Sequence, residues 1–168
     1  DGYMIPKKIH YCWFGKGKKS KLALKCIRSW RQYCPEYEVI EWNEENFDID
    51  MNGYTRMCYA EKKYAYLSDY VRLWVVEKYG GIYFDTDVEV IRSLEELLRN
   101  DAFFCFENKQ YVASGLGFGS VAHGKVIQAM LKEYEILLDG KNGVRMCPKL
   151  NTQALVALGL KQNGRKQN

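Results

Sequence analysis

The chain has 168 residues, 47% of them hydrophobic and 27% charged, and a net charge of +4. This balance is typical of a single globular domain and excludes a disordered chain. The mildly positive charge is not the concentrated patch of a nucleic-acid-binding protein, so we expect no nucleic-acid partner.

Basic residues gather at Lys7 and Lys8, at residues 16–21 and at the C-terminus. They fit a nucleotide diphosphate, a polyanionic substrate or an anionic membrane surface, with a solvated loop as the alternative. No stretch of about 18 apolar residues and no signal peptide is visible, so no membrane span is expected. We expect a cytoplasmic protein, with peripheral contact at the inner face of the membrane left open.

The six cysteines include no CxxC pair, which argues against a zinc ribbon or a thioredoxin-like site. Several lie in apolar surroundings, as Cys105 does in AFFCFE. We therefore expect reduced cysteines that belong to the core.

The first third of the chain predicts a βαβ unit. Residues 7–13, KKIHYCW, read as a strand, and residues 21–34 read as an amphipathic helix that ends before Pro35. Residues 37–42, YEVIEW, read as the next strand, which implies a right-handed crossover. His10 has no nearby partner for a metal and is expected to be a packed strand residue.

Residues 54–79 are expected to be largely helical, with a break near residues 65–68. Gly80 and Gly81 end the helix, because glycine accepts the left-handed conformation of a helix C-terminus. Residues 82–84, IYF, then form a short buried strand.

Two carboxylates, Asp85 and Asp87, follow this strand. At a strand end or in a turn both can converge on one hard cation such as Mg²⁺ or Mn²⁺, whose other positions are filled by water or phosphate oxygens. Asp69 and Arg72 share a helix face, and Arg72 offers a planar fork for phosphate or hydroxyls. The alternatives are a solvated acidic turn, a surface ion pair, and an N-cap role for Asp69.

The second half of the chain carries weaker signals. Ser93 and Glu96 have the spacing of a capping box for a helix over residues 94–99. The glycine-rich residues 111–120 lack the spacing of a dinucleotide fingerprint and predict strand and turn where backbone approaches a ligand. Further expected elements are a buried strand over 102–106 and helices over 124–138 and 153–158.

These motifs together resemble glycosyltransferase family 32, which includes yeast-type mannosyltransferases and bacterial capsular polysaccharide enzymes and is related to the glucosylating domains of clostridial toxins. IPKKIHYCWFG, residues 5–15, resembles the N-terminal signature, and residues 147–152 resemble the GPxxxT segment with Cys147 in place of glycine. The SDxxR and GGxYxDxD patterns are matched by Ser68, Asp69, Arg72, Gly80, Gly81, Tyr83, Asp85 and Asp87.

The resemblance implies an α/β fold of the GT-A kind, with a mixed, mostly parallel sheet flanked by helices. It also implies one glycosyltransferase domain over residues 1–168, without the family's C-terminal segment that carries His and Trp and closes over the diphosphate.

The resemblance also assigns roles. Asp69, Arg72, Asp85 and Asp87 form the implied catalytic set. Asp87 is the implied metal ligand, and Asp85 contacts sugar or ribose hydroxyls and the metal's water shell. Asp69 and Arg72 hold the donor sugar, and Tyr83 shapes the pocket.

Trp13 is the candidate for stacking on the nucleotide base, with a core tryptophan as the alternative. The implied reaction is the retaining transfer of a hexose from a nucleotide-sugar, most simply a UDP-sugar, to a saccharide or lipid-linked saccharide acceptor in surface polysaccharide synthesis. Mn²⁺ or Mg²⁺ is the implied cofactor, and front-side attack is preferred because no carboxylate nucleophile is evident.

Two other functions compete with this one. A phosphatase of the haloacid-dehalogenase type also places DxD after an apolar strand, with the first Asp as nucleophile. A non-catalytic module that binds a sugar nucleotide or a glycan would share the donor-side residues without turnover.

Overall fold

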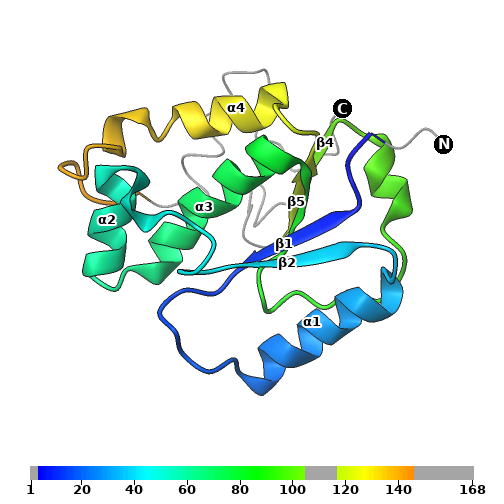
Figure 1. The fold of residues 1–168 in the computed structure, drawn as a ribbon. Coiled ribbons are helices and arrows are strands. Elements are labelled where there is room, and N and C mark those ends of the chain that lie inside the picture. The colour runs from blue at the N-terminus through cyan, green and yellow to red at the C-terminus, as the bar shows by residue number, and fades with distance from the viewer. Residues whose placement is uncertain (1–3, 105–116, 146–168) are drawn as a thin grey trace, which may run out of the picture.

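The computed structural model describes residues 4–104 and 117–145. They form a mixed sheet in the order β2-β1-β3-β5-β4 with helices on both faces (Figure 1). The strands are β1 (Lys8–Cys12), β2 (Glu38–Trp42), β3 (Gly81–Tyr83), β4 (Ala102–Phe104) and β5 (Phe118–Ser120). The helices are α1 (Lys21–Tyr33), α2 (Gly53–Ala60), α3 (Tyr64–Tyr79) and α4 (Lys125–Lys132), with short 3₁₀ helices η1 (Ile49–Met51), η2 (Glu95–Arg99) and η3 (Glu135–Leu137).

The parallel part of the sheet confirms the predicted βαβ unit. β1 pairs in parallel with β2 and with β3, so that Ile9 lies opposite both Val39 and Ile82. α1 connects β1 to β2 on one face, whereas α2 and α3 lie on the other face (Figure 1). β5 pairs antiparallel with β3 and β4. The carboxyl ends of β1 and β3 therefore form a topological switch point, where α/β sheets bind ligands.

Local sequence explains where α1 and α3 begin or end. Ser20 caps α1, since its Oγ accepts a hydrogen bond from the Ala23 amide at 3.1 Å. α3 ends at Gly80, where φ is 69°, and Gly81 follows with φ of 119°. Both values favour glycine. Gly81 is already the first residue of β3, so helix and strand join without a loop.

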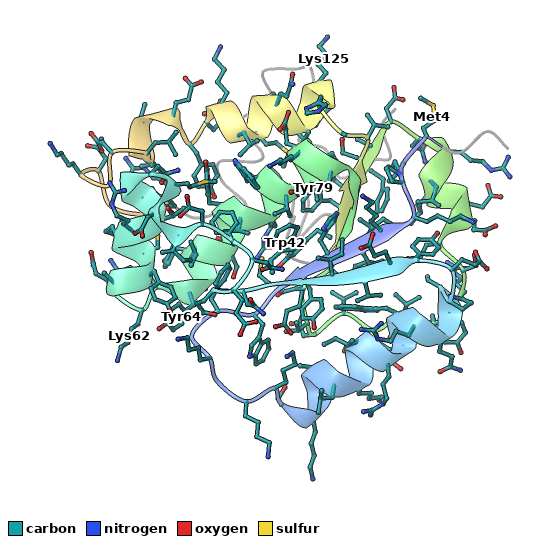
Figure 2. All side chains as sticks on the ribbon, viewed as in Figure 1. Met4, Trp42, Lys62, Tyr64, Tyr79 and Lys125 are labelled. Carbon is teal, nitrogen blue, oxygen red and sulfur yellow. The ribbon has the colours of Figure 1, made fainter. Side chains whose placement is uncertain are left out.

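The core lies on both sides of the sheet. Leu67 and Val71 of α3 and Tyr134 belong to one buried cluster, and Ile9 and Trp30 belong to the other, beneath α1. The rings of Trp42 and Tyr79 stack with centroids 5.6 Å apart on the α3 side (Figure 2). Cys12, Cys26, Cys34 and Cys58 are buried free thiols, as predicted, while Cys105 and Cys147 lie outside the described residues.

Two predicted helix boundaries are wrong. The break in the long helical stretch falls at residues 61–63 rather than 65–68, because Lys62 adopts a left-handed φ of 57° between α2 and α3. The helix predicted over 124–138 divides into α4 and η3. There the i→i+3 bond from the Tyr134 amide to the Leu131 carbonyl tightens the chain and buries Tyr134 and Leu137.

The capping box predicted at Ser93 is also wrong. The Ser93 hydroxyl accepts from the Glu95 amide at 3.3 Å, two residues on, and Leu94 takes the N-cap position of η2. The segment forms a 3₁₀ turn that buries Leu98 rather than an α-helix.

Candidate active site

The site lies where β1 and β3 end, because Asp85 follows β3 and Trp13 follows β1 directly. The Phe84 amide donates to the His10 carbonyl at 3.1 Å, which continues the parallel ladder to the residue before Asp85. α3 packs along the same two strands and contributes Asp69 and Arg72. The sheet thus brings together residues that lie far apart in the sequence.

Arg72 is the centre of the site. Its side chain is 5% exposed, and its Nη2 lies 3.1 Å from Oδ1 of Asp69, which is 19% exposed. Its Nε donates to the Ser68 carbonyl at 3.1 Å, and its guanidinium lies over the Tyr83 ring, 4.6 Å from the centroid. This excludes the surface ion pair, and Asp69 lies inside α3 rather than at its N-cap. The carboxylate, the carbonyl and the ring together fix the orientation of the guanidinium.

Tyr83 is fully buried beneath Arg72 and is hydrogen-bonded to the thiol of Cys12. Burial raises the pKa of Tyr83 well above its ordinary value, and Arg72 opposes that rise. Burial likewise raises the pKa of Cys12 to about 12. Both side chains therefore remain protonated beneath the guanidinium, and the pocket-shaping role of Tyr83 stays a prediction.

Asp85 and Asp87 lie in a turn rather than along a strand, closed by a hydrogen bond from the Val88 amide to the Asp85 carbonyl at 3.1 Å. Burial raises the pKa of Asp85, and the neighbouring charge of Asp87 adds to the rise, while Arg72 opposes it. Because Arg72 and Asp87 both act on Asp85, the two halves of the predicted catalytic set share one electrostatic environment.

These carboxylates fit a hard divalent cation. Within residues 4–104 and 117–145, no group of three or more His, Cys, Asp and Glu side chains could hold a metal. A pair of carboxylates suits Mn²⁺ or Mg²⁺, which take their remaining ligands from water and phosphate. A cation between Asp85 and Asp87 would relieve the repulsion that helps to raise the pKa of Asp85.

The segment after the DxD turn is held by α1, which the sequence analysis missed. The indole Nε1 of Trp30 donates to the Val88 carbonyl at 2.8 Å, and the Ser29 hydroxyl accepts from the Val90 amide at 2.9 Å. Trp30 is fully buried and Ser29 is 6% exposed. No strand forms at residues 88–91, and α1 satisfies backbone groups that a sheet would otherwise pair.

Arg72 and its partners Ser68, Asp69 and Tyr83 form the Arg72 network. Among the described residues, Trp13 is not part of it. Its Nε1 donates to the Gly17 carbonyl at 2.8 Å, and the Lys19 ammonium lies 5.6 Å from its ring centroid. The ring is partly buried against the α1 cluster. Trp13 thus lies at the end of β1 with its indole beside Lys19, and its stacking on a base stays a prediction.

The loop between β1 and α1 is tied to the end of β2. Lys19 Nζ lies 2.6 Å from Oε1 of Glu41, which also accepts from the Tyr11 hydroxyl at 2.8 Å. Burial alone would raise the pKa of Glu41, but hydrogen bonds from Lys19, Asn43 and Tyr11 lower it overall. The pairing of Lys19 with Glu41 was not predicted, because charged surface residues carry no local signal of their partners.

His10 is a packed strand residue, as predicted. Its Nδ1 accepts from Trp42 Nε1 at 3.0 Å, and its Nε2 donates to the Gly80 carbonyl at 2.8 Å. Burial lowers the pKa of His10 to about 4. The neutral imidazole joins the Gly80 turn to β1 and β2.

The described glycines of the glycine-rich segment serve packing. A Cβ on Gly119 would collide with the Phe103 ring, and one on Gly117 would lie 3.1 Å from Phe84. This differs from the predicted ligand approach. The rest of that segment, residue 106, the 147–152 motif and the helix over 153–158 lie outside the described residues.

The family model "Glycosyltransferase sugar-binding region containing DXD motif" matches residues 20–104, about half of the chain. The chain is 32% identical over 106 residues to the inositol phosphoceramide mannosyltransferase 3 of Schizosaccharomyces pombe, covering 59% of this chain and 29% of that protein. It is also 32% identical over 101 residues to a human alpha-1,4-N-acetylglucosaminyltransferase, covering 57% and 27%. The chain thus spans less than a third of either curated relative.

Among solved structures, the PaToxG glycosyltransferase superposes with a TM-score of 0.72 at 19% identity, covering 92% of this chain and 69% of that one. This likeness shows the fold, which is the expected GT-A-like α/β architecture. The matched residues 20–104 contain the Arg72 network and the DxD turn, so the chain belongs to the family of glycosyltransferase sugar-binding regions with a DXD motif.

Proposed function

We propose that this chain binds a nucleotide-sugar and transfers its sugar, with retention of anomeric configuration, to a saccharide or lipid-linked saccharide acceptor. The observation that supports this most is the buried Asp69–Arg72 pair, stacked on Tyr83 and electrostatically coupled to Asp85. This arrangement orients donors for a sugar and its phosphates beside two carboxylates. Family membership favours a sugar transferase over the phosphatase interpretation.

Asp85 and Asp87 would hold Mn²⁺ or Mg²⁺, which when bound neutralises the charge that develops on the leaving diphosphate. Arg72 would donate to the diphosphate or the sugar, and Asp69 would accept from a sugar hydroxyl while keeping Arg72 in place. Asp69, Asp85 and Asp87 are then all engaged, so we propose front-side substitution rather than a covalent glycosyl intermediate.

We propose a UDP-hexose as the donor and surface polysaccharide synthesis as the role. Two relatives are a mannosyltransferase and an N-acetylglucosaminyltransferase, so the donor sugar is a property to be screened. The buried free thiols agree with a reducing, cytoplasmic setting. No helix within the described ranges is long and apolar enough to cross a membrane.

Calorimetric titration of UDP into the chain, with and without Mn²⁺, tests the donor site. We expect Mn²⁺-dependent binding that Asp87→Ala abolishes and that Asp101→Ala, an exposed control, leaves unchanged. Binding that is insensitive to Mn²⁺ and to Asp87→Ala would contradict the proposal. Incubation with UDP-hexoses, followed by detection of released UDP and of the product anomer by NMR, then separates a transferase from a module that only binds.

A further inference from the structure

Positive charge is densest in one segment of the chain. Seven of the 25 Lys and Arg residues lie within residues 16–31, where none of the 21 Asp and Glu residues occurs. The other 18 basic residues are outnumbered by the 21 acidic ones. A second basic stretch, residues 140–168, holds six Lys and Arg residues and no Asp or Glu. Residues 16–31 are the basic segment that the structure describes in full, and such a concentration of charge attracts anionic surfaces.

In the structure these residues form a continuous outer surface. α1 covers its face of the sheet and turns Ala23, Cys26, Ile27, Ser29 and Trp30 inward, and its opposite side meets solvent (Figure 1). The outward side chains are all basic or uncharged. We call the exposed cations of this helix and of the preceding loop the α1 basic face: Lys16, Lys18, Lys21, Lys25, Arg28 and Arg31.

Carboxylates of other elements neutralise little of this face. Lys19 is excluded from it because its ammonium is paired with Glu41 at 2.6 Å and is only 26% exposed. Lys25 lies 3.8 Å from Glu89, but the two side chains are 61% and 48% exposed, so solvent screens the pair. The positive charge of the α1 basic face can therefore act on an external anionic partner.

Apolar side chains flank the cations. Leu22 is 54% exposed and Leu24 is 42% exposed, and they lie on opposite sides of the α1 basic face. Exposed aliphatic side chains beside lysine and arginine suit the boundary between headgroups and acyl chains of an anionic bilayer. A nucleic-acid surface would instead offer phosphates and stacking bases, which leucine does not recognise.

We propose that the α1 basic face docks on a bilayer rich in anionic phospholipid. One cation of this face lies near the candidate active site, since Lys25 Nζ lies 3.8 Å from Glu89, two residues after Asp87. Docking would therefore hold the site beside the lipid surface, where a lipid-linked acceptor is presented. That consequence for the acceptor rests on the proposed function, whereas docking itself does not.

Co-sedimentation with vesicles tests the proposal without donor, metal or acceptor. We expect binding to phosphatidylcholine vesicles that contain phosphatidylglycerol, weak binding to pure phosphatidylcholine, and loss of binding as salt is raised. Each cation near the surface contributes about a five-fold change in partition, so Lys21→Gln/Lys25→Gln/Arg28→Gln together should weaken binding about a hundred-fold.

The matched control is Lys125→Gln/Lys132→Gln/Lys141→Gln, which removes the same charge from exposed positions. Lys125 projects from α4 on the opposite side of the molecule from α1 (Figures 1 and 2). This variant should bind nearly as wild type, and Lys21→Arg/Lys25→Arg should retain binding. Circular dichroism verifies that each variant is folded.

Three outcomes would overturn the proposal: equal binding to zwitterionic and anionic vesicles, equal losses in the two triple variants, or tighter binding to duplex DNA or RNA than to anionic vesicles at the same salt. Because UDP titration with Mn²⁺ is a separate measurement, failure of docking and failure of the proposed function can be told apart.

Discussion

The indole of Trp30 donates a 2.8 Å hydrogen bond to the carbonyl of Val88, a residue 58 positions later that directly follows the DxD turn. Ser29 makes a second bond to Val90 from the same helix. We call these two hydrogen bonds the α1 clamp, because they hold the backbone that directly follows Asp87. α1 itself contributes no side chain to the Arg72 network.

Replacing Trp30 by Phe should loosen this clamp. The substitution keeps an aromatic ring in the core but leaves the half-buried Val88 carbonyl without its donor, at a cost of about 1–3 kcal/mol in the free energy of unfolding. Hydrogen exchange of the peptide over residues 85–91 should accelerate, and Mn²⁺-dependent UDP binding should weaken. Trp42→Phe is the matched control, since its indole binds His10 instead. Equal exchange at residues 85–91 in both variants would contradict the clamp.

Arg72→Lys should impair donor binding although it keeps the charge. The planar guanidinium donates to the Ser68 carbonyl and to Asp69 while it stacks on the Tyr83 ring. A lysine ammonium lacks the planar shape that allows all three contacts at once. We expect a loss of about 1–3 kcal/mol in stability and at least about a ten-fold loss in UDP-sugar affinity, measured by chemical denaturation and calorimetry. Arg56→Lys, at an exposed arginine of α2, should leave both quantities near the wild-type values.

The Lys19–Glu41 pair should influence nucleotide binding through the loop that contains Trp13. Lys19→Glu and Glu41→Lys should each weaken UDP binding about two- to five-fold, in keeping with a partly exposed ion pair. The double variant Lys19→Glu/Glu41→Lys should regain part of the loss, as a double-mutant cycle would measure. Purely additive losses would show that the pair does not position the loop.

His10 should make stability depend on pH. Its folded pKa of about 4 lies below the ordinary value of 6.5, so the unfolded chain binds a proton more readily than the native one. Its contribution is complete above pH 6.5, falls by about 3 kcal/mol as pH drops toward 4, and then levels off. Urea denaturation across this range, compared with His10→Gln, isolates the effect. An unchanged slope in His10→Gln would assign it to other groups.

Gly119→Ala should destabilise the β4–β5 edge of the sheet. The added methyl would meet the Phe103 ring, and displacing a packed ring costs about 1–3 kcal/mol. Gly17→Ala, where no atom lies within 4 Å of the new methyl, should be nearly neutral. Thermal unfolding of the two variants provides the comparison, and equal midpoints would show that Phe103 moves aside freely.

The sequence predicts most of the fold because its signals are local. Alternating and helical apolar patterns identify α1, α3 and the parallel strands, and the glycine pair identifies the turn into β3. The Arg72 and DxD residues are also recognisable, since all lie within about twenty residues with fixed spacing. Boundaries fail where a residue without a sequence signal sets the backbone, as Lys62 does between α2 and α3.

The remaining features depend on tertiary contacts. Nothing in the local pattern of Trp30 predicts that its indole binds a backbone carbonyl beyond the DxD turn. The pairing of Lys19 with Glu41 is equally invisible, because it follows from the parallel neighbours β1 and β2. Supporting residues of this kind become evident only when the chain is folded.

The direct junction of α3 with β3 has a consequence for how donor preference can diverge among relatives. A Cβ on Gly80 would lie 2.8 Å from the Ala122 amide, and one on Gly81 would lie 2.8 Å from the Lys8 carbonyl, so the junction tolerates neither side chains nor spare residues. The junction therefore limits any change in the separation between Arg72 and Asp85. If these two residues bind the donor as proposed, a different donor sugar would be accommodated by the loops around them rather than by a change in their separation.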